Sequence, residues 1–486
     1  MELIKSKTQQ WVPCVNGIWL HSRYDPLKEG ETFGRELGSH HTAIVVGLGF
    51  AYHLHSLKTR IKKLFVLEPN QELYQAYLEH FPPPTFKILC GTKEEMLQEL
   101  RLELDTEELK GIKVLMHQPS LKASAALFSG LIEGLNAMLE KCLLNLITDS
   151  AFGGLWTYNV LKNLRLPLKA PLFENKSSSP VFLLGSGYTA KLAIPFLRQN
   201  QDKIIIFAVP PVLPLLARDG IVPDAVFLVD AGWANRHYAG KEFRVPLLTY
   251  LSSSSFFVAQ WPGEVFFLNS SLDLENFLIP EFPRLGMSGS VANSLLSLAL
   301  WISDEIFMAG FDFSFVEGYY HYPGNLLEKA LLFKSGKIKS LETHQLELIN
   351  QGKSMSILGG RGQTLKSNQA MSAYHSDFCS KIIDSKRKRF YLLSEDGALL
   401  PHTTLFEGNL LARTTKDWNI RSLYPVSDLI ERLKLLKAQF EGEGGKLPDS
   451  VRIHKTRWII KQEDWKSEQA RVVSKIEELI KSLGVW

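Results

Sequence analysis

Two short segments rich in glycine and serine have the composition of anion-binding loops. They are Gly185-Ser186-Gly187 and Ser288-Gly289-Ser290. The first follows the apolar run 181–184, and the second opens an apolar stretch expected to be a helix from Val291. A strand, a tight glycine turn and a helix start direct free backbone N–H groups at one point, which suits a phosphate. Two such loops in one domain predict that a nucleotide is bound there.

Two aspartates and one histidine accompany these loops. Asp230 and Asp312 end apolar runs, and ligands of open α/β sheets bind at the carboxyl ends of parallel strands. Asp230 is suited to hold a ribose hydroxyl or a magnesium ion, or to serve only the scaffold. His321 lies in the aromatic loop 317–324, which either closes over a substrate while His321 exchanges a proton, or packs aromatic rings around an incidental histidine. Serine capping of the helix is the alternative function of Ser288 and Ser290.

A third glycine pair, Gly47-Leu-Gly49, follows the apolar run 43–46, and Glu68 ends the next apolar run. This spacing is typical of a dinucleotide or methyl-donor site, in which the carboxylate binds a ribose hydroxyl. Tyr52 occupies the place of the third glycine, so a turn that only packs a helix on a sheet is the competing interpretation. Histidines 53 and 55, like the pair 40–41, lack metal-ligand spacing, and we expect no resident metal site.

The bulk composition excludes several classes of protein. The 486 residues include 55 basic and 51 acidic side chains, a formal charge of +4, which does not indicate a nucleic-acid partner. Four scattered cysteines fit a reducing compartment. The sequence shows no apolar run long enough to span a membrane and no secretion-type leader, so we expect a cytoplasmic protein without a membrane span.

The alternation of apolar runs with helix-like segments predicts an α/β protein with parallel sheets. We expect an N-terminal Rossmann-like domain over residues 1–170, a central Rossmann-like α/β domain over 171–411, and a small helical C-terminal region over 412–486. The central domain is expected to contain strands near 181–184, 204–209, 225–229, 246–250, 265–268 and 305–309, with a late strand at 389–393.

Six elements in order resemble the central domain shared by the Maf (motility-associated factor) proteins and the pterin diphosphokinase MptE, a domain that is also similar to bacterial sialyltransferases. They are Gly185-Ser-Gly187, Gly220-Ile-Val-Pro-Asp224, Asp230, Ser288-Gly-Ser290-Val-Ala, Gly310-Phe-Asp312 and His321. The flanking segments, including Gly47-Leu-Gly49 and Glu68, favour Maf over the shorter diphosphokinase.

The resemblance implies a glycosyltransferase that moves a nonulosonic acid, of pseudaminic or legionaminic type, from a CMP-activated donor to Ser or Thr of flagellin, as flagellum assembly and motility require. It further implies that the two loops and Asp312 bind the nucleotide and its phosphate, that Asp230 contacts the nucleoside, and that His321 takes the acceptor proton. Mg²⁺ is optional. Tyr188-Thr189 and Pro210-Pro211 depart from the family pattern, and the prolines remove two backbone donors.

Three other functions remain open on the sequence. A diphosphokinase that transfers pyrophosphate from ATP to a pterin would use Asp230 and Asp312 as magnesium ligands. A non-catalytic flagellin-binding assembly factor would keep the fold without the chemistry. A methyltransferase would use the Gly47 and Glu68 segment.

Overall fold

The computed structural model describes residues 1–33, 40–55, 57, 60–104, 108–173, 177–232, 238, 242–286, 289–350, 352–408, 410, 416–423, 428–442 and 465–483. The chain divides into two compact units, Met1–Ala151 and Phe152–Trp486. The boundary lies inside one 33-residue helix, α6 (Leu131–Asn163). The expected division at residues 170 and 411 stays a prediction.

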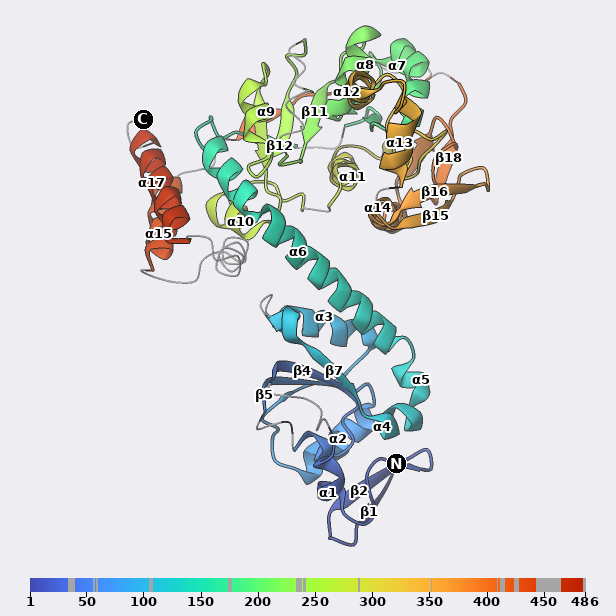
Figure 1. Ribbon diagram of the computed structural model, residues 1–486, viewed down its shortest axis with the longest axis vertical. Coiled ribbons are helices and arrows are strands. Elements are labelled where there is room, and N and C mark those ends of the chain that lie inside the picture. Colours follow the sequence, from blue (N-terminus) through green and yellow to red (C-terminus); the bar gives the residue numbers. More distant parts are fainter. Residues whose placement is uncertain are drawn as a thin grey trace. The chain divides into compact units, whose positions relative to one another are not determined.

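The first unit is built on a four-stranded parallel sheet with the strand order β6-β5-β4-β7. Apolar clusters lie on both of its faces, as expected of strands buried on both sides. Figure 1 shows the strands β4, β5 and β7 of this sheet with α2 and α3. An antiparallel ribbon of β1, β2 and β3 precedes the sheet. The strands are β1 (Glu2–Lys5), β2 (Trp11–Val15), β3 (Ile18–Trp19), β4 (His40–Val46), β5 (Ile61–Leu67), β6 (Lys87–Leu89) and β7 (Lys113–Met116). The helices before α6 are α1 (Pro26–Gly30), α2 (Gln71–His80), α3 (Lys93–Glu103), α4 (Gln118–Ala123) and α5 (Ala125–Phe128), with 3₁₀ turns at Tyr52–Leu54 and Glu108–Gly111.

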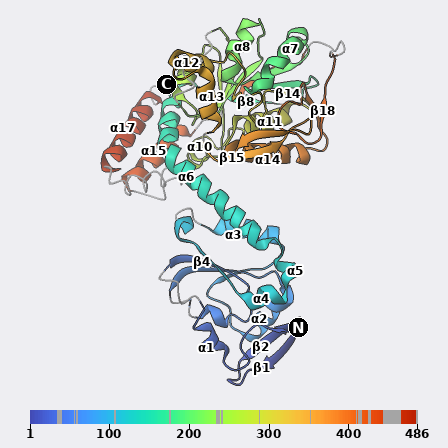
Figure 2. The same cartoon turned by 45° about the vertical axis from the view of Figure 1, so that its right-hand side comes forward.

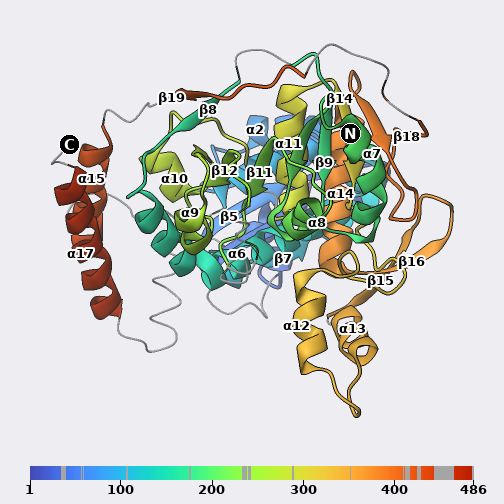
Figure 3. The same ribbon diagram turned by 90° about the horizontal axis from the view of Figure 1, so that it is seen from above.

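The second unit is built on an eight-stranded sheet with the order β13-β12-β11-β10-β9-β14-β17-β18, in which every neighbouring pair is parallel. Figure 3 shows the central strands side by side, with helices on both faces. The strands are β9 (Val181–Leu184), β10 (Ile205–Ala208), β11 (Ala225–Leu228), β12 (Leu247–Tyr250), β13 (Val265–Leu268), β14 (Glu305–Ala309), β17 (Arg389–Leu392) and β18 (Thr403–Leu405). β9, β10, β11 and β14 are buried along their whole length, which explains their unbroken apolar sequences.

The helices of this unit follow the strands, and two small antiparallel sheets are added to it. The helices are α7 (Ile194–Asn200), α8 (Leu213–Arg218), α9 (Ser255–Gln260), α10 (Asp273–Leu278), α11 (Val291–Ile302), α12 (Leu326–Lys334), α13 (Leu341–Ile349), α14 (Gln369–Asp384), α15 (Leu429–Glu441) and α17 (Trp465–Leu483), with 3₁₀ turns at Tyr188–Ala193 and Pro210–Val212. The small sheets pair β15 (Ser354–Leu358) with β16 (Thr364–Asn368), and β8 (Ala170–Leu172) with β19 (Arg421–Leu423). α11 packs against α14 (Figure 2), and α15 lies beside α17 (Figures 1 and 3).

The expected fold class is confirmed: both sheets are parallel and Rossmann-like, and the late strand predicted at 389–393 joins the larger sheet as β17. The C-terminal region is helical, and its apolar residues pack into the core of the second unit through Leu433, Phe440 and Ile476. Among the helices that the structure describes, none has the length and apolar character needed to cross a membrane.

The helix pair α12–α13 contributes little to that core. α12 contains no buried residue and α13 contains only Ile349. The side chains of Phe333 and Ile338 are almost fully exposed.

The backbones of β9 and β14 approach each other closely just past their ends. The Gly185 N–H donates to Ala309 O at 2.8 Å, and the Gly187 N–H donates to Gly310 O at 2.9 Å. A Cβ atom on Gly185 would lie 2.3 Å from the Gly310 carbonyl oxygen, which no side chain tolerates. The two strand ends can meet only because Gly185 and Gly310 both lack a side chain.

We therefore expect Gly185→Ala to lower the free energy of unfolding by about 1–3 kcal/mol, because the new methyl group would push the two strand ends apart. The midpoint of urea unfolding measures the change. Gly336→Ala is the matched control, because a Cβ atom there meets nothing within 4 Å. Equal midpoints for the two variants would contradict the close approach described here.

Candidate functional site

The larger sheet reverses its strand order between β9 and β14, and this reversal places two loops next to each other. β9 leads into Gly185–Gly187 and β14 leads into Gly310–Asp312, and the two strands are hydrogen-bonded neighbours. In open parallel sheets the crevice at such a reversal is where ligands bind. The predicted Gly185 loop and Asp312 are therefore brought together at the sheet's natural binding edge.

Asp312 is buried, and its carboxylate is held by Thr189 together with the Tyr188 backbone. The Thr189 N–H donates to Asp312 Oδ2 at 3.0 Å, and the Thr189 hydroxyl donates to Oδ1. The same hydroxyl accepts the Gly310 N–H at 2.8 Å. Burial raises the pKa of Asp312 to about 6, although the hydrogen bonds from Thr189 act in the opposite direction. Both carboxylate oxygens are thus engaged within the protein, and Asp312 fixes the Gly185 loop in place.

His321 lies against the Gly185 loop. Its Nδ1 is 3.0 Å from Ser186 Oγ, and the next residue, Tyr322, donates its N–H to Ser186 O at 3.0 Å. The Tyr322 hydroxyl donates to Pro211 O at 3.0 Å, so the aromatic loop is tied to the loops after β9 and β10. Burial lowers the pKa of His321 to about 4, and a contact with the Ser186 backbone partly offsets this effect. With this lowered pKa the ring is neutral at pH 7 and is a weaker proton acceptor than an ordinary histidine.

The start of α11 lies at the same edge of the sheet, because a helix that leads into a parallel strand runs opposite to it. Ser290 caps α11 by accepting the Ala292 N–H at 3.2 Å. Gly289 has φ +69°, and a Cβ atom there would lie 3.4 Å from the Tyr374 ring. Asn293 is fully buried: its Nδ2 donates to Tyr374 O at 3.1 Å, while its Oδ1 has no hydrogen-bond partner among the described residues. Ser288 lies outside the described residues.

Aromatic side chains connect this helix start to the Gly185 loop. Tyr374, which contacts Gly289, interacts electrostatically with Tyr320. The Tyr320 ring packs edge-on against His321 at 4.6 Å between centroids, and His321 contacts Ser186. The Gly185 loop and the start of α11 therefore lie at the same edge of the sheet, with Tyr374, Tyr320 and His321 between them.

Asp230 lies at the same edge of the larger sheet but makes none of the contacts described above. It lies just beyond β11, two strands away from β9, and its side chain is exposed. Its Oδ1 accepts the Gly232 N–H at 2.8 Å, which is a local turn. Asp224 acts as scaffold: its carboxylate accepts the Ile206 N–H at 2.8 Å and pairs with Lys416. No side chain of the described residues bridges Asp230 to Asp312 in a hydrogen bond, and the nucleoside contact of Asp230 stays a prediction.

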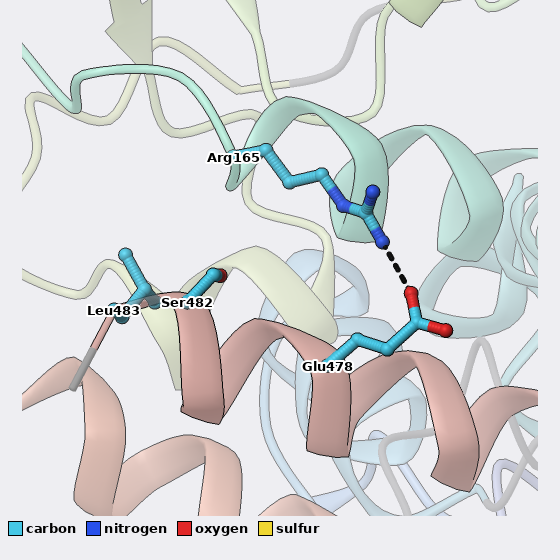
Figure 4. A pocket seen from close by; sticks show the side chains of 4 residues that line it. All are labelled: Arg165, Glu478, Ser482 and Leu483. Carbon is cyan, nitrogen blue, oxygen red and sulfur yellow. Dashed lines mark hydrogen bonds and ion pairs between the residues drawn. The ribbon is translucent and has the colours of Figure 1, made fainter. Parts of the chain in front are cut away.

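A hollow lined by Arg165, Glu478, Ser482 and Leu483 lies beside α17 (Figure 4). Arg165 and Glu478 form an exposed ion pair across it at 2.8 Å. None of the predicted site residues lines this hollow, and its charges are already paired, so it carries no functional argument.

In the first unit, histidine side chains occupy the space in front of the Gly47–Gly49 turn. A Cβ atom on Gly49 would lie 2.4 Å from His21 Nε2. Glu68 is buried and accepts the N–H groups of Leu48 at 2.8 Å and Asn70 at 2.9 Å. Burial raises the pKa of Glu68 to about 7. The carboxylate thus holds the turn itself, which supports the packing interpretation of this segment.

Two features of the structure were missed at the level of sequence. The family pattern has serine at the position of Thr189, and we therefore treated Thr189 as a departure from that pattern. In the structure, Thr189 holds Asp312 through two hydrogen bonds. The local spacing of His53 and His55 excluded a metal site, yet one ring nitrogen from each of His21, His53 and His117 lies within 4.8 Å of the others. The sequence contained one indication of this cluster: His117 ends the apolar run 114–117. That run forms the strand next to the one that precedes Gly47.

Comparison with known families and solved structures shows what the chain resembles. A family model described as 6-hydroxymethylpterin diphosphokinase MptE-like matches residues 156–318, a range that contains both glycine loops and Asp312. The solved structure of MAf glycosyltransferase from Magnetospirillum magneticum AMB-1 matches with a TM-score of 0.65 and 13% identity, covering 99% of this chain and 91% of that chain. No curated protein matches the chain.

Part of the second unit, residues 156–318, is thus similar to the MptE-like family. The resemblance to the Maf proteins is confirmed at the level of the fold, which this chain shares with that glycosyltransferase along almost its whole length.

The pKa of Asp312 predicts how stability depends on pH. Because the folded-state pKa is about 6 and the ordinary value is 3.8, the folded protein holds a proton that the unfolded chain releases in this range. This contribution is fully present below pH 3.8 and is lost as the pH rises to about 6. Relative to Asp312→Asn, the unfolding free energy of the unsubstituted chain should fall by up to about 3 kcal/mol over that range.

Chemical unfolding of both proteins at several pH values measures this difference. The lost hydrogen bond in Asp312→Asn adds a constant offset that does not vary with pH. A difference that stays constant between pH 4 and pH 6 would therefore exclude a buried Asp312 with a raised pKa.

Proposed function

We propose that this chain is a glycosyltransferase that moves a nonulosonic acid from a CMP-activated donor to Ser or Thr hydroxyl groups of flagellin. The single observation that carries the proposal is the contact of a neutral histidine, His321, with the glycine loop at the strand reversal. A proton acceptor then stands beside a loop suited to a phosphate. The shared fold with a Maf glycosyltransferase supports the same conclusion.

The proposed reaction uses these residues as follows. The acceptor hydroxyl attacks the anomeric carbon of the sugar, the bond from that carbon to the CMP phosphate breaks, and CMP leaves as an anion. With Nδ1 bonded to Ser186, His321 keeps Nε2 to take the hydroxyl proton. The N–H groups of Gly185 and Gly187 already donate to Ala309 O and Gly310 O, so the Ser186 residue and the start of α11 are left to stabilise the charge that develops on the phosphate. Asp312 positions the Gly185 loop through Thr189.

The diphosphokinase is the second candidate, because the matching family model bears that description. Magnesium chemistry requires ionised carboxylates with free oxygens. Both oxygens of Asp312 accept hydrogen bonds from Thr189, and burial raises its pKa to about 6. Asp230 is exposed and lies two strands away from β9. These arrangements favour the transferase.

Thermal unfolding with separate ligands distinguishes the candidates. We expect CMP alone to raise the melting temperature, because a ligand that binds only the folded state stabilises it by about 2.7 kcal/mol at a concentration a hundredfold above its Kd. ATP with Mg²⁺ should give no shift. A shift with ATP and Mg²⁺ but not with CMP would favour the diphosphokinase, S-adenosylmethionine binding would favour a methyltransferase, and no shift at all would favour a non-catalytic assembly factor.

His321→Ala should keep CMP binding and lower transfer by about 10²–10⁴-fold, because it removes only the proton acceptor. Transfer to flagellin is measured by intact-protein mass spectrometry, and CMP binding by thermal shift. His344→Ala is the control, since that residue lies in α13 outside the proposed site. Full transfer by His321→Ala would remove His321 from the mechanism.

A further inference from the structure

Three buried histidines gather at the strand reversal of the smaller sheet. In the order β6-β5-β4-β7, the reversal falls between β4 and β7. The Gly47–Gly49 turn follows β4, and His117 directly follows β7. His53 lies in the 3₁₀ turn after Gly49, and His21 comes shortly after β3. The edge where this type of sheet binds ligands is thus lined by imidazole rings that the proposed transfer reaction does not use.

The three rings are close and almost inaccessible to solvent. Their exposed fractions are 4% for His21, 2% for His53 and 5% for His117. One ring nitrogen of each lies within 4.8 Å of the others. The rings of His53 and His117 stack at 4.0 Å between centroids, and those of His21 and His117 at 5.0 Å. One ring nitrogen of each histidine is therefore near the other two, and the stacked rings would turn to aim their in-plane lone pairs at one ion.

Hydrogen bonds to the outer nitrogens orient two of the rings as in metal sites. His53 Nε2 is 3.2 Å from Gly47 O, and because a carbonyl only accepts, Nε2 carries the hydrogen. The other nitrogen, Nδ1, therefore has a free lone pair, and it is buried without a hydrogen-bond partner among the residues that the structure describes. His117 Nδ1 bonds Ser120 Oγ at 2.7 Å, which leaves its Nε2 for a ligand. Metal-binding histidines use such outer contacts to fix their tautomer.

His21 has to give up an existing hydrogen bond in order to bind an ion. Its Nε2 accepts the Phe50 N–H at 2.8 Å, so this lone pair is in use. A bound ion would take the place of that hydrogen bond. Burial lowers the pKa values of all three histidines, for His117 to about 4, so the rings are in the neutral form that binds metals.

We propose that His21, His53 and His117 together bind one zinc ion. Zinc favours tetrahedral sites with imidazole ligands, and three histidines leave a fourth position for water or a small donor. The ion would link the segment after β3, the 3₁₀ turn at Tyr52–Leu54 and the start of α4. Because these rings are buried, the ion stabilises this unit and does not act on the sugar donor.

The test uses the full chain, stripped with a chelator, dialysed against Zn²⁺ and washed. Inductively coupled plasma mass spectrometry should find about one zinc per chain, and zinc should raise the melting temperature. His53→Gln should weaken zinc binding by at least about tenfold, since the amide replaces the Gly47 contact but not the ligand. His55→Gln is the matched control, because His55 is exposed and lies outside the cluster.

Ser120→Ala keeps all three rings and serves if His53→Gln does not fold. It should weaken zinc binding by roughly 10–100-fold, because it removes only the hydrogen bond that orients His117. The visible absorption of tetrahedral Co²⁺ in the chelator-treated chain gives a second measurement. Zinc bound no more tightly by the unsubstituted chain than by His53→Gln or Ser120→Ala would overturn the proposal and leave a purely packed histidine cluster. Neither measurement needs a sugar donor, so the result is independent of the proposed transfer.

Discussion

The close approach of two glycine backbones at the ends of β9 and β14 is the constraint on which the candidate site depends. Gly185 and Gly310 lie too near each other for either to carry a side chain. Their contact sets the register of the loops beyond them, so that Thr189 reaches both Asp312 and the Gly310 N–H. Ser186 then faces His321. These polar contacts therefore depend on Gly185 and Gly310, two positions at which only glycine fits.

Both sheets reverse their strand order and place functional groups at the reversal, but the two edges differ in their chemistry. The larger sheet presents glycine loops, serines and one neutral histidine, and its buried carboxylate acts as an internal brace. The smaller sheet presents three packed imidazoles and a carboxylate that holds its own turn. Burial keeps the histidines neutral and raises the pKa values of the carboxyl groups at both edges. The same topology therefore places glycine loops and one histidine at the reversal of one sheet and a cluster of three histidines at the reversal of the other.

Most strands of the larger sheet could be predicted from the sequence because each is a short apolar run, whereas β18 (Thr403–Leu405) is not apolar enough to be recognised. The glycine loops and Asp312 could be placed together because parallel strands end at one edge. Thr189 could not be recognised, since its importance comes from a contact with a residue far along the chain. The histidine cluster was missed for the same reason: its members come from three distant segments, and local spacing carries no information about them. The ribbon of β1–β3 has too few residues per strand to give a periodic signal.

The helix pair α12–α13 begins directly after the His321 loop, and its first turn is tied to that loop: Asn325 Nδ2 donates to the Tyr322 carbonyl and caps Glu328. Beyond that turn almost nothing in the pair is buried. Core packing therefore places few constraints on the sequence of the pair, while its first turn stays hydrogen-bonded to the His321 loop. The sequence and the length of such a segment can differ between related proteins without unfolding the rest of the domain.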